Sequence, residues 1–277
     1  MITSASKIWV VGGASGVGKC TTARLLKKGY FVINSDCDSE KLNSLKSEFS
    51  EYIEKKLYLL PLDITDRSAT KACISVIREK FAPLDSVVIS AAIHSSYPAE
   101  YLTDKSIDQN IDVNLSAHIK LTRDTLPILK DGGRIIGISS IAAGLGVPME
   151  SMYSATKAGL EAFYESMATE ISYRKIKPIV IHPGNINTGF NETGNDYSPT
   201  GNRFVDDGYK RVVSGIDSSK GMKPEAVSEV ILKAIESSSP RFSYIVGMNA
   251  LKAHWAKRLL GRDLALKLMA KFFGFSI

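Results

Sequence analysis

The stretch Ile8-Trp9-Val10-Val11-Gly12-Gly13-Ala14-Ser15-Gly16-Val17-Gly18-Lys19-Cys20-Thr21 decides the fold. Four apolar residues run directly into a glycine-rich loop, and amphipathic helical spacing begins at Thr21. Glycines let a backbone turn tightly and approach a phosphate, whose charge is favoured by the free amides at the start of the next helix. The stretch therefore predicts a buried strand, a phosphate-binding loop and a helix.

Short apolar runs alternate with amphipathic segments along the rest of the chain. The runs have no polar face, which is typical of parallel strands buried on both sides. The expected strands are residues 8–11, 31–33, 57–60, 87–89, 135–138, 178–181 and 244–246. The expected helices are residues 21–28, 39–50, 68–81, 110–129, 151–173 and 224–237. Repeated βα units predict one α/β domain over residues 1–277, a doubly wound parallel sheet of about seven strands between two helical layers.

One segment interrupts this alternation. Residues 189–221 are rich in Asn, Asp, Ser, Gly and Pro and show no clear apolar period. The segment is long for a loop in a compact domain, which favours a substrate lid over an ordinary surface excursion.

The composition is that of a globular protein with a full core, because 44% of the 277 residues are hydrophobic and 23% are charged. Three cysteines, Cys20, Cys37 and Cys73, form no C-x-x-C pair, so neither a disulfide framework nor a metal site is expected. No apolar run approaches the roughly 18 residues of a membrane span, and no signal peptide is evident. A cytoplasmic protein is expected.

The net charge of +6 is concentrated in the tail, where residues 252–277 hold six basic residues and one acidic residue. The rest of the chain is almost neutral, which argues against a nucleic-acid partner. Residues 248–277 are expected to form basic amphipathic helices with apolar stripes. Such helices can lie on an anionic membrane surface; the alternatives are packing on the protein's own core or on a second subunit.

The glycine loop fits two phosphate-binding patterns. Residues 13–20 match the P-loop pattern G-x-x-x-x-G-K-S/T except at Cys20, whose thiol is a poor magnesium ligand. The spacing of Gly12, Gly16 and Gly18, G-x-x-x-G-x-G, is instead a dinucleotide-binding form of the loop. The loop alone does not decide between them.

Asp36, at the end of the second expected strand, helps to choose between the patterns. A carboxylate at this place accepts hydrogen bonds from the adenosine ribose hydroxyls and repels a 2′-phosphate. This favours NAD over NADP. The alternative is that Asp36 caps the helix that begins near Asp38.

A second group of polar residues lies downstream. Tyr153 and Lys157 share one face of an expected helix, so the ammonium favours the phenolate form of the tyrosine. Ser140 follows the strand at 135–138, and ligands of open α/β sheets bind at the carboxyl ends of strands. Asn114 lies on the preceding helix, and residues 183–188 form a turn that ends in a hydroxyl.

The motifs resemble, in order and spacing, the short-chain dehydrogenase/reductase family from Ile8 to about Val246. The matching motifs are Gly12/Gly16/Gly18, Asp63-Ile64, Asn114, Ser140, Tyr153/Lys157, and Pro183-Gly184 with Thr188. The resemblance implies a Rossmann fold, a homodimer or homotetramer, and metal-free hydride transfer between a nicotinamide cofactor and an alcohol or ketone.

The resemblance also implies a role for each matched residue. Tyr153 is the general acid/base, and Lys157 lowers the pKa of Tyr153 and binds the nicotinamide ribose. Ser140 holds the substrate oxygen, and Asn114 anchors a water that passes the proton onward from Lys157. Cofactor contacts fall, in addition to Tyr153 and Lys157, on Gly12, Ser15, Gly16, Val17, Gly18, Asp36, Asp63, Ile64, Ala91, Pro183, Gly184, Ile186 and Thr188. Among these, Thr188 binds the carboxamide, and Asp63 with Ile64 contacts the adenine.

Two positions depart from the family pattern. Val11 stands where the family usually has a threonine that braces the loop, and Ser90 replaces an asparagine that stabilises the central sheet. The tail is similar to those of retinol and hydroxysteroid dehydrogenases in the family, which implies a hydrophobic lipid- or steroid-like substrate. Two other functions stay open: a cofactor-sensing binding protein without turnover, and a P-loop phosphotransferase that uses Lys19.

Overall fold

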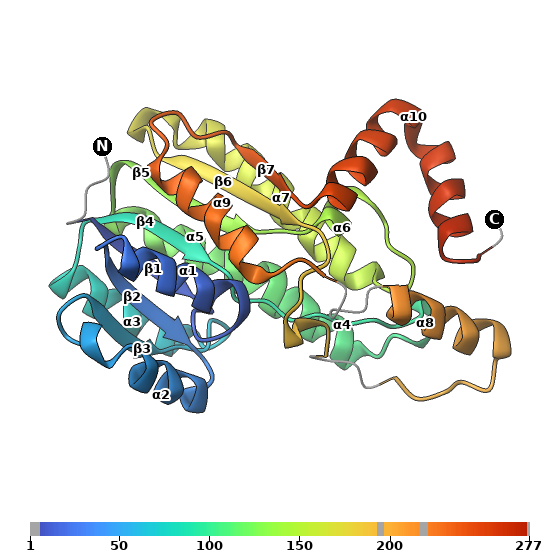
Figure 1. The fold of residues 1–277 in the computed structure, drawn as a ribbon, viewed down its shortest axis with the longest axis horizontal. Coiled ribbons are helices and arrows are strands. Elements are labelled where there is room, and N and C mark those ends of the chain that lie inside the picture. Colours follow the sequence, from blue (N-terminus) through green and yellow to red (C-terminus); the bar gives the residue numbers. More distant parts are fainter. Residues whose placement is uncertain (1–5, 193–196, 216–220, 276–277) are drawn as a thin grey trace.

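The computed structural model of the protein describes residues 6–192, 197–215 and 221–275. Its centre is a parallel sheet with the strand order β3-β2-β1-β4-β5-β6-β7 (Figure 1). The strands are β1 (Lys7–Val11), β2 (Phe31–Asp36), β3 (Leu57–Pro61), β4 (Leu84–Ile89), β5 (Leu129–Ile138), β6 (Lys177–Pro183) and β7 (Ser243–Val246). The prediction of a doubly wound, seven-stranded parallel sheet is confirmed.

Helices cover both faces of the sheet because alternate residues of each strand point to opposite sides. Ile8 and Val10 of β1 pack in the core under α1 (Gly16–Lys27), α2 (Ser39–Glu48) and α9 (Pro224–Glu236). Trp9 and Val11 pack in the core under α3 (Arg67–Lys80), α5 (His118–Thr125) and α7 (Ser151–Glu170). This double burial explains why the strands have no polar face.

The expected helix at residues 110–129 is interrupted. Helix α4 (Asp104–Ile111) ends in a π-helical turn, η3 (Asp112–Ala117), before α5 begins at His118. Residue Asn114 lies in this turn, and its buried side chain binds backbone outside the helix. Such π-turns are often found at functional sites.

A helix also occupies the segment in which no apolar period is evident. Helix α8 (Arg203–Gly215) buries Val205, Gly208 and Val212 on one face. A methyl group at Gly208 would lie 2.8 Å from Cε1 of Phe275, so the small residue makes room for an aromatic ring. The interpretation that residues 189–221 show no clear apolar period is therefore wrong for residues 203–215, where Val205, Tyr209 and Val212 recur at helical spacing.

The chain ends in α10 (Met248–Phe272), which bends at Gly261 (φ 76°, ψ 170°) into a first arm, residues 248–260, and a second arm, residues 262–272. The arms project from the body, and the second comes back toward α8 (Figure 1). Arg211 of α8 donates hydrogen bonds to the backbone oxygens of Phe273 (3.1 Å) and Gly274 (3.3 Å). We call this the Arg211 clamp. Within the part of the chain that the structure describes, no helix is long and apolar enough to cross a bilayer.

Candidate active site

The glycine loop lies at the carboxyl end of β1, beside the reversal of strand order between β1 and β4. Gly12 has a φ of +71°, and a methyl group there would lie 2.5 Å from the backbone nitrogen of Ala91. Only glycine fits at this position, so the loop is held directly against the end of β4. Ligands of open α/β sheets bind at such a reversal.

The start of α1 supplies the free amides that an anion needs. Ser15 is the exposed N-cap residue, and Val17 and Gly18 are buried in the first turn. Gly16, the first residue of the helix, has a φ of +48°. The backbone amides here can bind a pyrophosphate, with the positive end of the helix dipole behind them.

A brace for this loop comes from a residue that sequence reasoning missed. The buried amide of Asn34 in β2 donates hydrogen bonds to the oxygen of Gly13 (2.8 Å) and to the hydroxyl of Thr22 (2.8 Å).

The two positions that depart from the family pattern, Val11 and Ser90, are joined by a backbone hydrogen bond. The nitrogen of Ser90 donates to the oxygen of Val11 (2.8 Å). The ladder between β1 and β4 therefore continues up to the loop, and Asn34 braces it from the side of β2.

The turn after β6 faces the same place. Pro183 ends β6, the nitrogen of Gly184 donates to the oxygen of Val246 (3.0 Å), and Ile186 forms an isolated bridge with Met222. These contacts fix the turn at the carboxyl edge of the sheet.

Thr188 then comes close to the glycine loop. A methyl group at Gly16 would lie 3.4 Å from Cγ2 of Thr188, and the Thr188 hydroxyl accepts a hydrogen bond from the nitrogen of Phe190 (3.3 Å). Two loops far apart in sequence thus form the two sides of a cradle that a side chain at Gly16 would narrow. This geometry fits the pyrophosphate of a dinucleotide between them.

Asp36 is buried at the end of β2 and braces the glycine loop. Its carboxylate accepts hydrogen bonds from the backbone nitrogens of Ala14 (3.0 Å) and Asp38 (3.1 Å). The side chain that caps α2 is Asp38, which accepts from the nitrogen of Lys41 (3.0 Å). The alternative that Asp36 caps this helix is therefore wrong.

A second carboxylate lies near the first. Asp63, after β3, accepts hydrogen bonds from the nitrogen (2.9 Å) and hydroxyl (2.7 Å) of Thr65, while the next residue, Ile64, is buried in the core. Burial first, and then the charges of Asp36 and Asp63, raise the pKa of the Cys37 thiol. The edge of the sheet at β2 and β3 is therefore electronegative.

The P-loop alternative conflicts with the position of Lys19. Its ammonium forms an ion pair with Glu48 of α2 at 2.6 Å. A P-loop lysine has to reach the terminal phosphates of a nucleotide across the loop. With Lys19 paired to α2 and Cys20 in place of the hydroxyl, the loop presents neither side chain in the way that this chemistry needs.

Tyr153 and Lys157 lie one turn apart near the start of α7, and both are buried. The ammonium nitrogen of Lys157 is 5.6 Å from the centre of the Tyr153 ring and donates a hydrogen bond to the oxygen of Ile138 (2.9 Å). Burial lowers the pKa of Lys157 to about 8. The pair is anchored to the end of β5, in the position expected for a proton-transferring phenol and its neighbour.

Ser140 joins this pair from the end of the same strand. Its hydroxyl caps the short helix α6 (Ile141–Gly144) by accepting from the nitrogen of Ala142 (3.1 Å). Burial first, and then the carboxylate of Glu150, raise the pKa of Tyr153 above its ordinary range, while a side-chain hydrogen bond with Ser140 lowers it. Burial, not Lys157, is therefore the largest influence on the Tyr153 phenol in this structure.

Asn114 lies close to the same edge but uses its side chain on backbone. Its amide oxygen accepts from the nitrogen of Ile93 and its amide nitrogen donates to the oxygen of Ile93, both at 2.9 Å. The side chain therefore ties the π-turn to the chain that follows β4. The water that Asn114 is expected to hold remains a prediction.

Three further residues surround Tyr153 that sequence reasoning missed. Nε2 of His94 lies 2.8 Å from Oε1 of Glu150, and both side chains are buried. The ring of His94 packs edge-on to Tyr153 with centroids 5.1 Å apart, and Phe190 lies 5.9 Å from His94 and 6.3 Å from Tyr153. The one signal in the sequence is a charged residue, Glu150, three positions before Tyr153, which gives no indication of its partner.

The chain matches known proteins over most of its length. The family model described as short chain dehydrogenase matches residues 6–198. A 3-ketodihydrosphingosine reductase of Bacteroides thetaiotaomicron is 26% identical over 87% of this chain and 87% of its own. A 3-oxoacyl-(acyl-carrier-protein) reductase of Thermotoga maritima is 29% identical over 86% of this chain and 92% of its own.

Solved structures show the same fold. A short-chain dehydrogenase from Streptomyces avermitilis superposes with a TM-score of 0.81 at 21% identity, covering 96% of this chain and 97% of its own. A closed form of serine dehydrogenase complexed with NADP+ gives a TM-score of 0.73 at 24% identity, covering 88% and 95%. With the family model matching residues 6–198, the chain belongs to the short-chain dehydrogenase family and is an NAD(P)-dependent oxidoreductase.

Proposed function

We propose that this oxidoreductase uses NAD(H) to interconvert a hydrophobic secondary alcohol and its ketone, with Tyr153 as the general acid/base. The observation that carries the proposal is the buried pair of Tyr153 and Lys157, with the half-buried Ser140 beside it, at the carboxyl edge of the sheet. This group lies at the same edge as the cradle between Gly16 and Thr188. When bound there, the nicotinamide cofactor supplies or accepts the hydride.

The chain's own residues handle the proton and the substrate oxygen. In the direction of reduction, the Tyr153 hydroxyl donates its proton to the carbonyl oxygen as hydride reaches the carbonyl carbon, which yields the alcohol and a phenolate. Ser140 orients the oxygen by a hydrogen bond. Lys157 stabilises the phenolate by its charge, and a pKa of about 8 lets it pass a proton back near neutral pH. Oxidation runs through the same steps in reverse.

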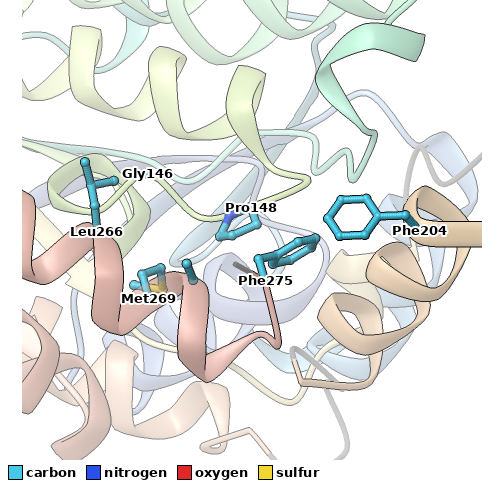
Figure 2. A pocket seen from close by; sticks show the side chains of 7 residues that line it. Gly146, Pro148, Phe204, Leu266, Met269 and Phe275 are labelled. Carbon is cyan, nitrogen blue, oxygen red and sulfur yellow. The ribbon is translucent and has the colours of Figure 1, made fainter. Parts of the chain in front are cut away.

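An apolar cavity bordered by the loop before α7 supports a hydrophobic substrate. The cavity has a volume of about 350 Å³ and lies between the loop before α7, α8 and the second arm of α10 (Figure 2). Its lining consists of Gly146, Pro148, Phe204, Leu266, Met269, Ala270 and Phe275. The nitrogen of Val147, in the same loop, donates to the hydroxyl of Ser154 (3.4 Å), the neighbour of Tyr153. The wall of an apolar cavity is thus joined to the proposed catalytic turn.

Other features support the rest of the proposal. The two relatives are named for reducing a 3-keto or a 3-oxoacyl group, which agrees with a lipid-like ketone as substrate. Residues 189–221, with α8, would act as the substrate lid, and residues 248–277 form a C-terminal appendage to the oxidoreductase domain. Free thiols at Cys20, Cys37 and Cys73 agree with action in the cytoplasm or at the surface of a membrane that faces it. Family membership supports a homodimer or homotetramer.

NADH is expected to support faster turnover than NADPH. The carboxylates of Asp36 and Asp63 repel a 2′-phosphate, and the nearby cation Lys41 is already paired with Asp38 at 2.9 Å. The serine dehydrogenase with bound NADP+ shows that the fold also accepts the phosphorylated cofactor. Asp36→Asn keeps an oxygen for the nitrogen of Ala14 but removes the charge and the acceptor of the Asp38 nitrogen. We expect it to reduce the ratio of NADH to NADPH turnover roughly tenfold.

The measurement is cofactor absorbance during turnover of a panel of hydrophobic secondary alcohols and ketones, in both directions and with both cofactors. A strong preference of the unchanged chain for NADPH would show that the Asp36 argument is wrong. Absence of turnover across the panel, with NADH still bound, would favour a cofactor-sensing protein.

The charge of Glu150 is expected to set the pH range of oxidation. Its carboxylate raises the pKa of Tyr153, so removal of the charge in Glu150→Gln should lower that pKa. The phenolate then forms at lower pH, and we expect the rising limb of kcat for alcohol oxidation to move down by roughly one pH unit. Gln retains an oxygen for His94. An unchanged pH profile in a folded variant would show that this charge has no effect on the phenol.

A further inference from the structure

The two arms of α10 expose a concentrated apolar surface. Of the thirteen large hydrophobic side chains that are exposed in the described residues, nine belong to α10, so the exposure is not scattered over the molecule. Seven of them form what we call the apolar stripe: Met248, Leu251, Trp255, Leu259, Leu264, Leu268 and Phe272. Leu259 and Phe272 are each 77% exposed. Contiguous apolar patches of this kind usually mark an interaction site.

The apolar stripe is not the face by which α10 packs on the body. Its members follow one another at three- or four-residue intervals within each arm, which places them on one side of each helix. The opposite sides are buried: Ala250 in the first arm is 1% exposed, and Ala270 in the second arm is 6% exposed. Each arm therefore has one face on the protein and one face that the described protein leaves uncovered.

Basic side chains border the apolar stripe. Lys252 lies one turn from Met248 and Trp255, and Lys267 and Lys271 each follow a stripe residue, Leu264 and Leu268, by three positions. All three lysines are exposed. Arg262 lies at the bend, and Asp263 is the one acidic residue between 248 and 272. We call Lys252, Arg262, Lys267 and Lys271 together the basic rim.

The charge of the basic rim decides between two occupants. A second copy of the chain, stacked on the same face, would bring two basic rims together and leave their repulsion unpaired. An anionic bilayer accepts both features, because apolar side chains enter the acyl boundary while lysines and arginines meet the head groups. We propose that the apolar stripe and basic rim of α10 dock on an anionic lipid bilayer.

The placement of α10 makes this contact accessible. The two arms of α10 extend from the body and meet at the bend (Figure 1), so α10 can be contacted on the sides that do not pack on the protein. The second arm also supplies Leu266, Met269 and Ala270 to the cavity wall. The docked helix therefore lies between the bilayer and the cavity. The proposal stands on the exposed surface and does not depend on the chemistry proposed for Tyr153.

Flotation with vesicles tests the proposal on the full chain. We expect the protein to float with vesicles of equal parts phosphatidylcholine and phosphatidylserine. With vesicles of phosphatidylcholine alone it should stay in the bottom fraction of the gradient. The double variant Leu259→Glu/Leu264→Glu should abolish flotation. The matched control is Tyr173→Glu, a charge placed at an 80% exposed aromatic residue far from α10, which should float as before.

The basic rim is tested by charge reversal. Lys267→Glu/Lys271→Glu should weaken partitioning at least 30-fold, since each basic residue near an anionic surface contributes about a fivefold gain. Lys71→Glu/Lys105→Glu, the same reversal at two exposed lysines of α3 and α4, should reduce it far less. Raised salt should weaken binding of the unchanged chain, because screening shortens the reach of the charges.

Tryptophan fluorescence reports the contact directly. Of the two tryptophans, Trp9 is completely buried in the core and Trp255 is 49% exposed in the apolar stripe. Brominated lipids should quench the emission that Trp255→Phe removes, and leave the emission of Trp9. The proposal is overturned if the chain does not bind anionic vesicles. It is also overturned if Leu259→Glu/Leu264→Glu changes only the oligomeric state in sedimentation, which would identify a second copy as the occupant.

Discussion

Tyr153→Phe is expected to lower kcat by roughly 10² to 10⁴-fold, the usual contribution of a positioned general acid/base, while changing the affinity for NADH far less, because the ring stays in place. The substitution removes the hydroxyl that exchanges a proton with the substrate oxygen. It keeps the ring that packs against His94 and Phe190. Initial rates from NADH absorbance, with a hydrophobic ketone in excess, and NADH titration followed by fluorescence measure the two quantities separately.

Tyr164→Phe is the matched control. Tyr164 is another buried tyrosine of α7, and its hydroxyl contacts His118 (3.0 Å) and Thr122 (3.4 Å). Loss of this hydroxyl leaves His118 without its partner, so we expect about 1–3 kcal/mol less stability to unfolding but a nearly unchanged kcat. Equal activity in Tyr153→Phe and the unchanged chain would exclude Tyr153 as the acid/base.

Gly12→Ala is expected to weaken NADH binding roughly 100-fold, because a displacement of about 1 Å in a binding loop can have an effect of this size. The new methyl group would lie 2.5 Å from the nitrogen of Ala91, so either the loop or the end of β4 has to move. Both lie where the cofactor is proposed to bind. Fluorescence titration with NADH gives the dissociation constant.

Gly132→Ala separates the two effects of Gly12→Ala, which are the strain of a left-handed backbone and the clash of the new methyl group with β4. Gly132 has nearly the same backbone conformation, φ +75° against +71°, but a methyl group there meets nothing within 4 Å. Both variants should lose about 1–2 kcal/mol of stability from the left-handed backbone. NADH affinity should fall in Gly12→Ala alone. If both variants bind NADH equally, the close approach of the loop to β4 has no part in binding.

The sheet could be predicted because its signal is local. Each strand is buried on both faces, so a short run such as residues 87–89 has no polar interruption. The helix that follows a strand shows instead the 3.6-residue spacing of apolar side chains. The positions of Ser140 and Tyr153 could be predicted for the same reason, since each follows a recognisable strand or begins a helix. Their approach to within hydrogen-bond range follows from the topology of the sheet.

Other features depend on tertiary contacts that no local pattern contains. In α8 the buried stripe includes Gly208, whose small size is explained by the ring of Phe275 against it, 67 positions further along the chain. The π-turn at Asn114 depends on backbone bonds to Ile93. His94 and Glu150 are 56 positions apart and meet because the chains after β4 and before α7 lie together at the site. The partners in each of these contacts are far apart in the sequence, so no local pattern predicts that they meet.

The Arg211 clamp gives the exposed tail a thermodynamic consequence. One guanidinium ties the helix on one side of the cavity to the last described turn of the appendage on the other. A change of either element thereby changes the free energy of the other. Linkage is reciprocal: if a lipid surface alters the cavity's affinity for a ligand by some factor, the ligand alters affinity for that surface by the same factor. Ligand binding in the cavity and protein binding to the lipid surface would then be thermodynamically coupled, so that a measurement of either one reports on the other.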